Sequence, residues 1–480
     1  MKMPEAIVSA IDKGTPLSKK LLNASYGLTV VSVLFFIFVI AFGHIGFFSA
    51  AYFSILSIGW QLALFFKSRT LKTPAEPRFY NHSFVFAIVT GLCSLISTGS
   101  FLAARAYDKI GALFALTNSF YPILFLYLHY LQSRRPYQDF DSVKTGLSFF
   151  REFGLGIFGL LFMLLHISSC NQAIALASEN AAYGQLPGQQ FNLPNTKVNL
   201  HVYCVGEKKN PTDPIVWFEH GLGGSYLDFT WVQKNVSTYA KTCAIDHGGL
   251  GWSSIPRYQR GTEKIVEELK ELLNEMKIKD DLLVVGHSMA GFNMRVAERL
   301  LDNRITGVVL VDPVDIEYTR NCAEDAPGYV NSLIALSPHI NTWGIPRLLA
   351  SSSIFPQAIR ELPNANAYFA NLFLNHNLYT RVSETKYYSQ SCGYAKRIVN
   401  TIPSKQNSNS SDPTFGNLPY GVITSKIGNA VDAFRMGRLS TNVIHVNATE
   451  SDHQTILWVE KEAVMVNDVV KQIFDRVLRK

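Results

Sequence analysis

Charged residues are scarce in this chain of 480 residues: Asp, Glu, Lys and Arg make up 17%, against 48% for the hydrophobic residue types. Soluble globular domains carry about 25% charged residues, so part of this chain is expected to lie in a membrane. Residues 26–66 contain none of these four charged residue types. At ~20 residues per crossing, that stretch is long enough for two membrane spans.

The chain also lacks any C-x-x-C pair, which argues against a zinc finger, and we expect no metal and no cofactor. Its formal net charge of +7 is modest for this length, and its basic residues do not cluster as on a surface that binds nucleic acid. Most of the cysteines are interpreted as small buried hydrophobic residues. Cys322 and Cys392 either form a disulfide or remain two unlinked thiols. The six cysteines are Cys93, Cys170, Cys204, Cys243, Cys322 and Cys392.

Long apolar runs occupy residues 1–170 and predict five membrane spans, with four or six as alternatives. The predicted spans cover residues 26–48, 49–66, 83–104, 110–131 and 152–169. Lys and Arg gather before the first span, between the second and third, and between the fourth and fifth. Short loops rich in these residues stay cytoplasmic, so the C-terminal part is expected on the luminal or extracellular side. Three glycosylation sequons, at Asn235, Asn409 and Asn447, agree with that orientation.

Residues 171–196 are polar and contain Pro and Gly, so they are interpreted as a linker or as an edge approach to the globular part. Beyond them, strand and helix patterns alternate, which predicts an α/β domain over residues 197–480 with a mostly parallel sheet. The predicted strands cover 197–205, 215–219, 242–246, 282–286, 307–312, 420–424 and 442–446. The predicted helices cover 229–239, 261–277, 291–302 and 456–479.

About 100 residues separate the fifth predicted strand from the sixth, which is too long for an ordinary connection. We therefore expect residues ~316–418 to form an inserted cap over the sheet. The segment is rich in aromatic residues, which suggests a lipid-like substrate unless these side chains form the core of the cap itself. The aromatic residues are Tyr318, Tyr329, Trp343, Phe355, Tyr368, Phe369, Phe373 and Tyr379.

The most informative motif is Gly286-His-Ser-Met-Ala290, which follows the apolar run 282–285 and precedes a helical pattern. A tight turn between a strand and a helix exposes a serine hydroxyl as a nucleophile, and it requires small residues two positions before and after that serine. The motif departs from G-x-S-x-G at Ala290, which is nearly as small as glycine. Ser288 is therefore the candidate nucleophile.

A glycine-rich turn, His220-Gly-Leu-Gly-Gly224, follows the second predicted strand. Glycine lets backbone N–H groups face a ligand, as an oxyanion hole requires. We expect the donors to be the N–H groups of Leu222 and of Met289, the residue after the nucleophile.

His453 is the candidate general base, because it lies in a loop between the last strand and the final helix. His445 is the other histidine after the cap, but it falls within the last strand and is expected to be buried. The carboxylate that orients the base is less well defined. Residues 420–429 contain no acid, so Asp312 is the first candidate, with Asp315 and Asp432 as alternatives.

Residues 197–480 resemble the α/β-hydrolases in the order and spacing of these motifs. The segment Asp246-His-Gly-Gly-Leu-Gly-Trp-Ser253 is similar to the family's DRxGxGxS turn, with His247 where arginine is usual. The resemblance implies a catalytic triad, and a serine at position 288 argues against epoxide hydrolases and haloalkane dehalogenases, which use aspartate. The N-terminal ~170 residues lie outside the resemblance.

These features favour a membrane-bound serine hydrolase that cleaves a small-molecule or lipid ester with Ser288, His453 and Asp312. An acyltransferase on the same fold is the first alternative, since the motifs do not distinguish water from another acceptor. The second is a catalytically inactive, hydrolase-like binding module on a membrane anchor. The sequence does not define the substrate or the oligomeric state.

Overall fold

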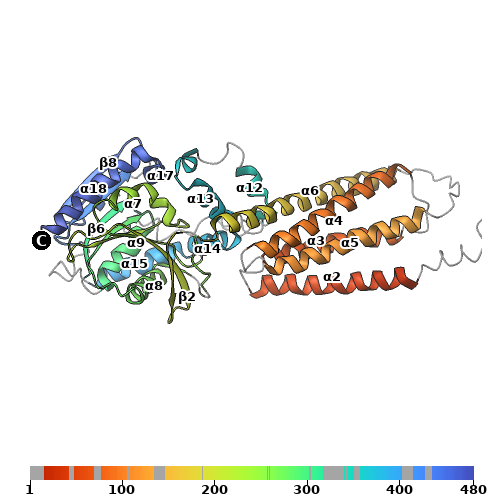
Figure 1. The fold of residues 1–480 in the computed structure, drawn as a ribbon, viewed down its shortest axis with the longest axis horizontal. Coiled ribbons are helices and arrows are strands. Elements are labelled where there is room, and N and C mark those ends of the chain that lie inside the picture. Colours follow the sequence, from red (N-terminus) through yellow and green to blue (C-terminus); the bar gives the residue numbers. More distant parts are fainter. Residues whose placement is uncertain are drawn as a thin grey trace, which may run out of the picture. The chain divides into compact units, whose positions relative to one another are not determined.

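The computed structural model describes most of the chain, in two compact units (Figure 1). One unit lies within residues 1–185 and 338–352, and the other within residues 186–337 and 353–480. Asp432, Cys322, Asn409, Tyr318, Tyr329 and Phe355 lie outside the described residues. The described residues are 16–42, 48–69, 77–104, 109–133, 146–185, 187–256, 258, 260–301, 304–316, 340–341, 343–350, 357–402, 415–426 and 435–479.

Five long helices form the first unit: α2 (Pro16–Phe42), α3 (Phe48–Arg69), α4 (Pro77–Ala103), α5 (Lys109–Ser133) and α6 (Gly146–Tyr183). Within the described residues, three segments are long and apolar enough to cross a membrane, namely Val85–Ala103, Gly111–Leu128 and Ile157–Tyr183. The sequence predicted five. Within the described residues of α2, an apolar helix of only 10–17 residues is found, Asn23–Leu34, so the structure supports three of the predicted spans.

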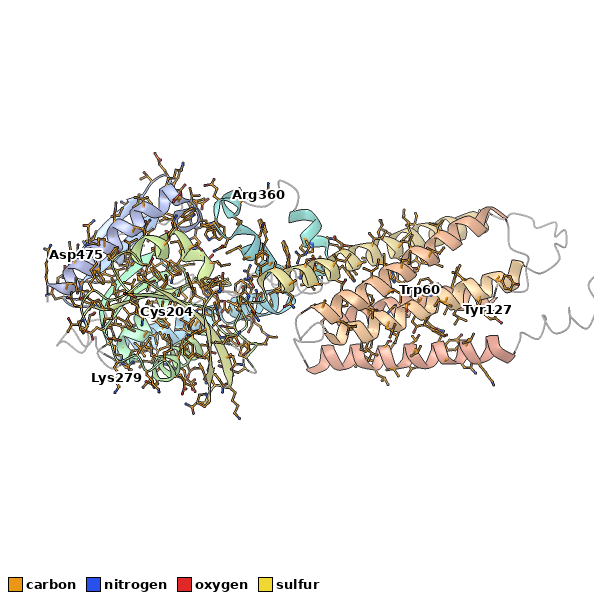
Figure 2. The ribbon with its side chains drawn as sticks, in the orientation of Figure 1. Trp60, Tyr127, Cys204, Lys279, Arg360 and Asp475 are labelled. Atoms are coloured by element: carbon orange, nitrogen blue, oxygen red, sulfur yellow. A yellow bond between two sulfur atoms is a disulfide. The ribbon has the colours of Figure 1, made fainter. Side chains whose placement is uncertain are left out.

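Polar groups lie inside the helix bundle and apolar side chains face outward, which is the arrangement expected of helices in lipid. Asn118 is fully buried and donates from Nδ2 to the carbonyl oxygen of Phe53 (2.6 Å) and to Oγ of Ser57 (3.1 Å). Trp60 is also fully buried, among aromatic rings of α4, α5 and α6 (Figure 2). By contrast, Leu113 and Ile123 of α5 are more than half exposed.

A short piece of the predicted cap belongs to the first unit. It contains α12 (Ile345–Ala350), and Arg347 in this helix donates from Nε to Oε1 of Gln172 (2.7 Å) and from Nη2 to Oε2 of Glu179 (3.0 Å). The hydroxyl of Ser168 also donates to the carbonyl oxygen of Trp343. These contacts attach the insert to the C-terminal part of α6.

The second unit is built on an eight-stranded sheet in the order β1-β2-β4-β3-β5-β6-β7-β8. The β1–β2 and β2–β4 pairs are antiparallel and the remaining pairs are parallel. The strands are β1 (Gln189–Leu193), β2 (Val198–Val205), β3 (Ile215–Glu219), β4 (Thr242–Ile245), β5 (Leu282–His287), β6 (Ile305–Val311), β7 (Tyr420–Ser425) and β8 (Val443–Ala448).

Helices cover both faces of this sheet because its central strands are apolar on both sides. Leu282 and Val284 of β5 share one buried cluster with α8 (Thr262–Glu275), α9 (Ala290–Leu300) and α15 (Tyr388–Thr401). The alternate residue Leu283 lies on the opposite face, with α18 (Glu460–Leu478). The helix α7 (Thr230–Val236) packs beside α18.

Three sequence-based expectations are wrong here. Residues 171–196 do not form a linker: they contain the end of α6, because small residues such as Ala173 pack inside the first unit. They also contain β1, an edge strand of the sheet, which agrees with the alternative interpretation as an edge approach. The helix α15 lies in the helix layer over the sheet, with Cys392 in the core, although the sequence placed it in the cap. His445 is exposed, because β8 is the edge strand.

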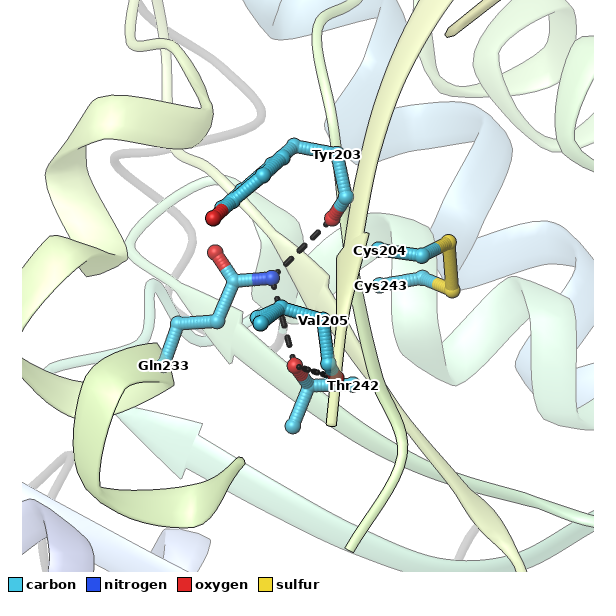
Figure 3. The surroundings of a disulfide bond; sticks show 6 residues. All are labelled: Tyr203, Cys204, Val205, Gln233, Thr242 and Cys243. Atoms are coloured by element: carbon cyan, nitrogen blue, oxygen red, sulfur yellow. Dashed lines mark hydrogen bonds between the residues drawn. A yellow bond between two sulfur atoms is a disulfide. The ribbon is translucent and has the colours of Figure 1, made fainter. Parts of the chain in front are cut away.

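A disulfide joins Cys204 and Cys243, which lie directly opposite each other on the antiparallel strands β2 and β4 (Figure 3). On the same strand pair, Gln233 of α7 donates from Nε2 to the carbonyl oxygen of Tyr203 (3.0 Å). Cys392 is disulfide-bonded as well, whereas Cys93 and Cys170 are free. The interpretation as buried thiols therefore holds for Cys170 and is wrong for Cys204 and Cys243, while Cys392 follows the disulfide alternative.

Candidate active site

Ser288 lies in the turn between the end of β5 and the start of α9, with a φ of +55° that residues other than glycine rarely adopt. A Cβ on Gly286 would lie 3.0 Å from Cβ of Ala290 and 3.1 Å from Cγ of Met294. Glycine at position 286 is therefore required, while alanine at 290 fits because its methyl group fills the space beside Gly286. The departure from G-x-S-x-G leaves the turn intact.

Three side chains from distant parts of the sequence meet at this turn. Nε2 of His453 lies 2.8 Å from Oγ of Ser288, and Nδ1 of His453 lies 2.5 Å from Oδ2 of Asp312. His453 comes from the loop after β8, and Asp312 directly follows β6. The hydrogen bonds form a continuous chain from a carboxylate through an imidazole to a hydroxyl. This geometry allows the imidazole to accept the serine proton while the carboxylate holds its other nitrogen.

Ser425, the last residue of β7, holds the Asp312 carboxylate in place. Its backbone N–H donates to Oδ1 (2.7 Å) and its hydroxyl donates to Oδ2 (2.9 Å). Burial would raise the pKa of Asp312, but the bonds from His453 and Ser425 lower it below its usual value. The candidate acid thus follows β6, and Ser425 at the end of the neighbouring strand β7 supports its carboxylate.

A second imidazole fixes the loop that carries His453. Burial and the neighbouring His453 lower the pKa of His287 to about 3, so His287 is neutral. Its Nε2 lies 2.8 Å from the carbonyl oxygen of His453 and donates to it, and the two rings lie 4.6 Å apart between centroids. His287, inside the serine motif, therefore anchors the backbone of His453.

Of the two other candidate acids, Asp315 pairs with arginine side chains and forms no hydrogen bond with His453 among the described residues. The carboxylate of Asp315 is buried, 3.5 Å from Nη1 of Arg295 and 3.7 Å from Nη1 of Arg435. Asp432 lies outside the described residues.

The glycine-rich turn after β3 lies against the serine. A Cβ on Gly221 would lie 2.8 Å from Cβ of Ser288, so only glycine allows this approach. Across the described chain, the backbone N–H groups of Leu222 and Met289 donate no hydrogen bond to the protein. Both predicted donors are therefore available for a ligand. His220 is buried, and its Nδ1 donates to the carbonyl oxygen of Gly221 (2.8 Å) while its Nε2 accepts from the N–H of His247 (3.2 Å).

A buried charge network behind this turn was not predicted. Nε2 of His247 lies 2.5 Å from Oε1 of Glu219 at the end of β3, and its Nδ1 lies 3.6 Å from Oε1 of Glu384 in α14 (Asn375–Lys386). Burial would lower the pKa of His247, but the two carboxylates raise it to about 9. The same contacts lower the pKa of Glu219 and of Glu384 against the effect of burial. The only signal in the sequence was His247 in place of arginine.

Two of the aromatic residues that the sequence placed in the cap are buried in the second unit. Tyr368 and Phe373, in and after α13 (Ala365–Leu372), are buried. Tyr368 packs edge-on against Trp458 of α17 (Thr455–Trp458). Their burial is that of core side chains and does not define a substrate.

Residues 214–346 match the family model described as "alpha/beta hydrolase fold". The chain is 32% identical over 120 residues to "Probable transporter efuK" of Hormonema carpetanum, covering 24% of this chain and 17% of that protein. It is 27% identical over 97 residues to "1-acylglycerol-3-phosphate O-acyltransferase ABHD5" of Rattus norvegicus, covering 20% of this chain and 28% of that protein. The chain thus spans less than a third of the length of either curated relative.

Solved structures with similar folds cover the second unit. The enol-lactonase from Burkholderia xenovorans LB400 is 14% identical with a TM-score of 0.45, covering 60% of this chain and 100% of that chain. A lipase described as putative, from Acinetobacter baumannii AYE, is 17% identical with a TM-score of 0.44, covering 64% of this chain and 96% of that chain.

Proposed function

We propose that this chain, whose second unit has the α/β-hydrolase fold, is a membrane-bound serine hydrolase that cleaves carboxylic esters. The observation that carries the proposal is the unbroken hydrogen-bond chain from Asp312 through His453 to Ser288, built on a turn in which Ser288 has a positive φ. Such a chain activates a serine that is otherwise a weak nucleophile.

In the proposed reaction Oγ of Ser288 attacks the ester carbonyl carbon while Nε2 of His453 takes the hydroxyl proton. The negative oxygen of the tetrahedral intermediate accepts hydrogen bonds from the N–H groups of Leu222 and Met289. His453 returns the proton to the leaving alkoxide, and an acyl-enzyme remains. Water, deprotonated by His453, then attacks the acyl carbonyl and releases the acid and Ser288. Asp312 keeps the imidazole in the tautomer that each step requires.

Acyl transfer to an alcohol is the second candidate, favoured by the similarity to a protein named as an acyltransferase. The two reactions share the acyl-enzyme and differ only in the acceptor. Product analysis with a long-chain ester, with and without added lysophospholipid, separates them: free fatty acid alone indicates hydrolysis, and a new acylated lipid indicates transfer.

We further propose that the second unit lies on the luminal or extracellular side. The disulfide between Cys204 and Cys243 supports this, since disulfides persist in oxidising compartments. Asn235 and Asn447, in two of the sequons, are exposed in the second unit. Treatment of the membrane protein with endoglycosidase is expected to increase its gel mobility. An unglycosylated protein whose C-terminus is cleaved by protease from the cytosolic side would contradict this topology.

The experiment that tests the activity is hydrolysis of a panel of esters of increasing chain length by the full chain in isolated membranes. Ser288→Ala is expected to abolish turnover. The matched control is Ser254→Ala, whose side chain accepts only from the N–H of Asn199 (2.8 Å) in the turn beside β2. No turnover by the wild-type chain, or equal turnover by Ser288→Ala, would leave the binding-module alternative in place.

A further inference from the structure

The helix α14 of the insert contacts both glycine turns beside the candidate site. At the first turn, Gly223 has a φ of +64°, and a Cβ there would lie 2.5 Å from Cγ of Arg381. At the second, Gly249 has a φ of +82°, and a Cβ there would lie 2.2 Å from Oγ1 of Thr380. The helix therefore packs directly on the backbone of both turns, and side chains on either glycine would displace it.

Glu384 of the same helix makes the one polar contact that reaches the oxyanion turn. Its Oε2 accepts the backbone N–H of Gly223 at 2.8 Å, and Glu384 is almost fully buried. Gly223 directly follows Leu222, whose N–H is the proposed oxyanion donor. The peptide plane that contains the Gly223 N–H also contains the carbonyl of Leu222, so this bond limits rotation of the backbone at Leu222.

A buried carboxylate needs nearby positive charge. Two cations face Glu384: Nδ1 of His247, 3.6 Å from Oε1, and Nη1 of Arg260, 3.5 Å from Oε1. Each cation has its own second carboxylate, Glu219 for His247 and Glu268 of α8 for Arg260.

The remaining titratable or charged neighbours are Tyr258 and His220, from other parts of the chain, and Arg381. Tyr258 donates to Glu268 (2.5 Å), His220 lies with its ring centroid 3.9 Å from that of His247, and Arg381 lies on α14 itself. No other side chain of the described residues forms an ion pair with His247 or Glu384.

We propose that Glu384 is a positioning residue that holds the 221–224 turn in the conformation required for oxyanion binding, with His247 as the titratable cation that keeps Glu384 ionised. The inference rests on the proposed hydrolase function. It assigns to the insert, through Glu384 of α14, a role in positioning the 221–224 turn. It also means that histidine instead of arginine at position 247 makes the charge there depend on pH, because an imidazolium loses its proton at a pH where arginine keeps it.

Removal of the carboxylate leaves the Gly223 N–H buried without an acceptor and frees the turn. Glu384→Ala is expected to lower kcat by about 10- to 100-fold with KM within twofold, since the oxyanion forms only in the transition state. Glu384→Gln can still accept from Gly223 and is expected to keep kcat within fivefold of wild type. The alkaline limit, the pH above which kcat falls, is expected to be lower in Glu384→Gln, because His247 loses a carboxylate that raises its pKa.

In the wild-type chain, loss of the His247 proton as the pH rises through about 9 is expected to lower kcat. His247→Arg keeps a cation and is expected to remove that decline. The matched control is Glu271, another buried glutamate that accepts backbone N–H bonds, from Asn195 (2.6 Å) and Thr196 (3.2 Å), at the turn between β1 and β2. Glu271→Ala and Glu271→Gln are expected to leave kcat and the pH profile unchanged.

The experiment measures kcat, KM and the pH profile of ester hydrolysis for these variants of the full chain, with thermal unfolding of each. The inference is overturned if Glu384→Ala keeps kcat within twofold of Glu271→Ala, or if its loss lies wholly in KM. If Glu384→Ala does not fold, Glu384→Gln decides, and an alkaline limit identical to that of wild type overturns it. Failure of the wild-type chain to hydrolyse any ester, by contrast, refutes the proposed function.

Discussion

Replacement of Asp312 by asparagine changes one atom at the candidate site, and the structure determines which way the new amide faces. Oδ1 of Asp312 accepts the backbone N–H of Ser425 at 2.7 Å. That N–H can only donate, so the amide oxygen must remain there and the NH₂ group must occupy the position of Oδ2. Oδ2 is the atom that accepts from Nδ1 of His453. The asparagine therefore presents a donor to Nδ1 and forces it to become an acceptor.

The proton of the imidazole then moves to Nε2, where it faces Oγ of Ser288 2.8 Å away. In this tautomer His453 cannot accept the serine proton. The same substitution in a serine protease triad costs ~10⁴-fold in kcat, which corresponds to about 5.5 kcal/mol of activation free energy. We expect a comparable loss for Asp312→Asn, with KM little changed.

The assay is steady-state ester hydrolysis by the membrane-bound chain, with Asp315→Asn as the control. Asp315 lies three residues further on, and its carboxylate contacts Arg295 and Arg435 and has no bond to His453. Asp315→Asn is expected to keep kcat within tenfold of wild type, although it destabilises the fold. A kcat of Asp312→Asn within tenfold of wild type, or an equal loss in both variants, would refute the assignment of Asp312 as the orienting acid.

Three further predictions concern the support of the site and the stability of the second unit. Ser425→Ala removes the hydroxyl bond to Asp312 but keeps the N–H bond, so it should lower kcat by about 3- to 10-fold, or about 1 kcal/mol, measured by the same assay. Replacing Cys204 and Cys243 by serine opens a loop with a sequence separation of 39, which should cost about 4 kcal/mol, measured by urea unfolding. The pKa of His247 is raised on folding to about 9, so its contribution of about 3 kcal/mol is complete below pH ~6.5 and lost as the pH rises through 9. Urea unfolding at pH 6, 8 and 10 should show this decline in wild type and a smaller one in His247→Gln; equal declines would contradict it.

The strands of the second unit were predictable because buried parallel strands give short apolar runs between helical patterns. The positions of Ser288 and His453 followed from that order, since the carboxyl ends of parallel strands lie on the same edge of a sheet. The strand β1 was missed because its sequence, QQFNL, is polar and only its last residue is fully buried. Pairing with β2 on one side stabilises β1. The hydrophobic pattern of residues 189–193 does not predict that pairing.

Contacts between distant segments account for the other features that were missed. The disulfide requires β2 to lie beside β4, and this pair is antiparallel. From β4 to β8 all neighbouring strands are parallel. Spacing along the chain does not reveal this neighbour. Similarly, Glu219 and Glu384 are 165 positions apart, and each alone is typical of a solvated surface carboxylate. Their shared partner His247 helps to make their burial favourable, and that partnership exists only in the folded chain.

The central claim is that Ser288 is a nucleophile activated by His453. Labelling with an active-site-directed fluorophosphonate, followed by mass spectrometry of the modified peptide, tests it most directly. In isolated membranes the wild-type chain is expected to carry one adduct on Ser288. His453→Ala should react at least 100-fold more slowly, and Ser288→Ala should not react. Absence of an adduct on the wild-type chain, or equal labelling rates for wild type and His453→Ala, would contradict the claim.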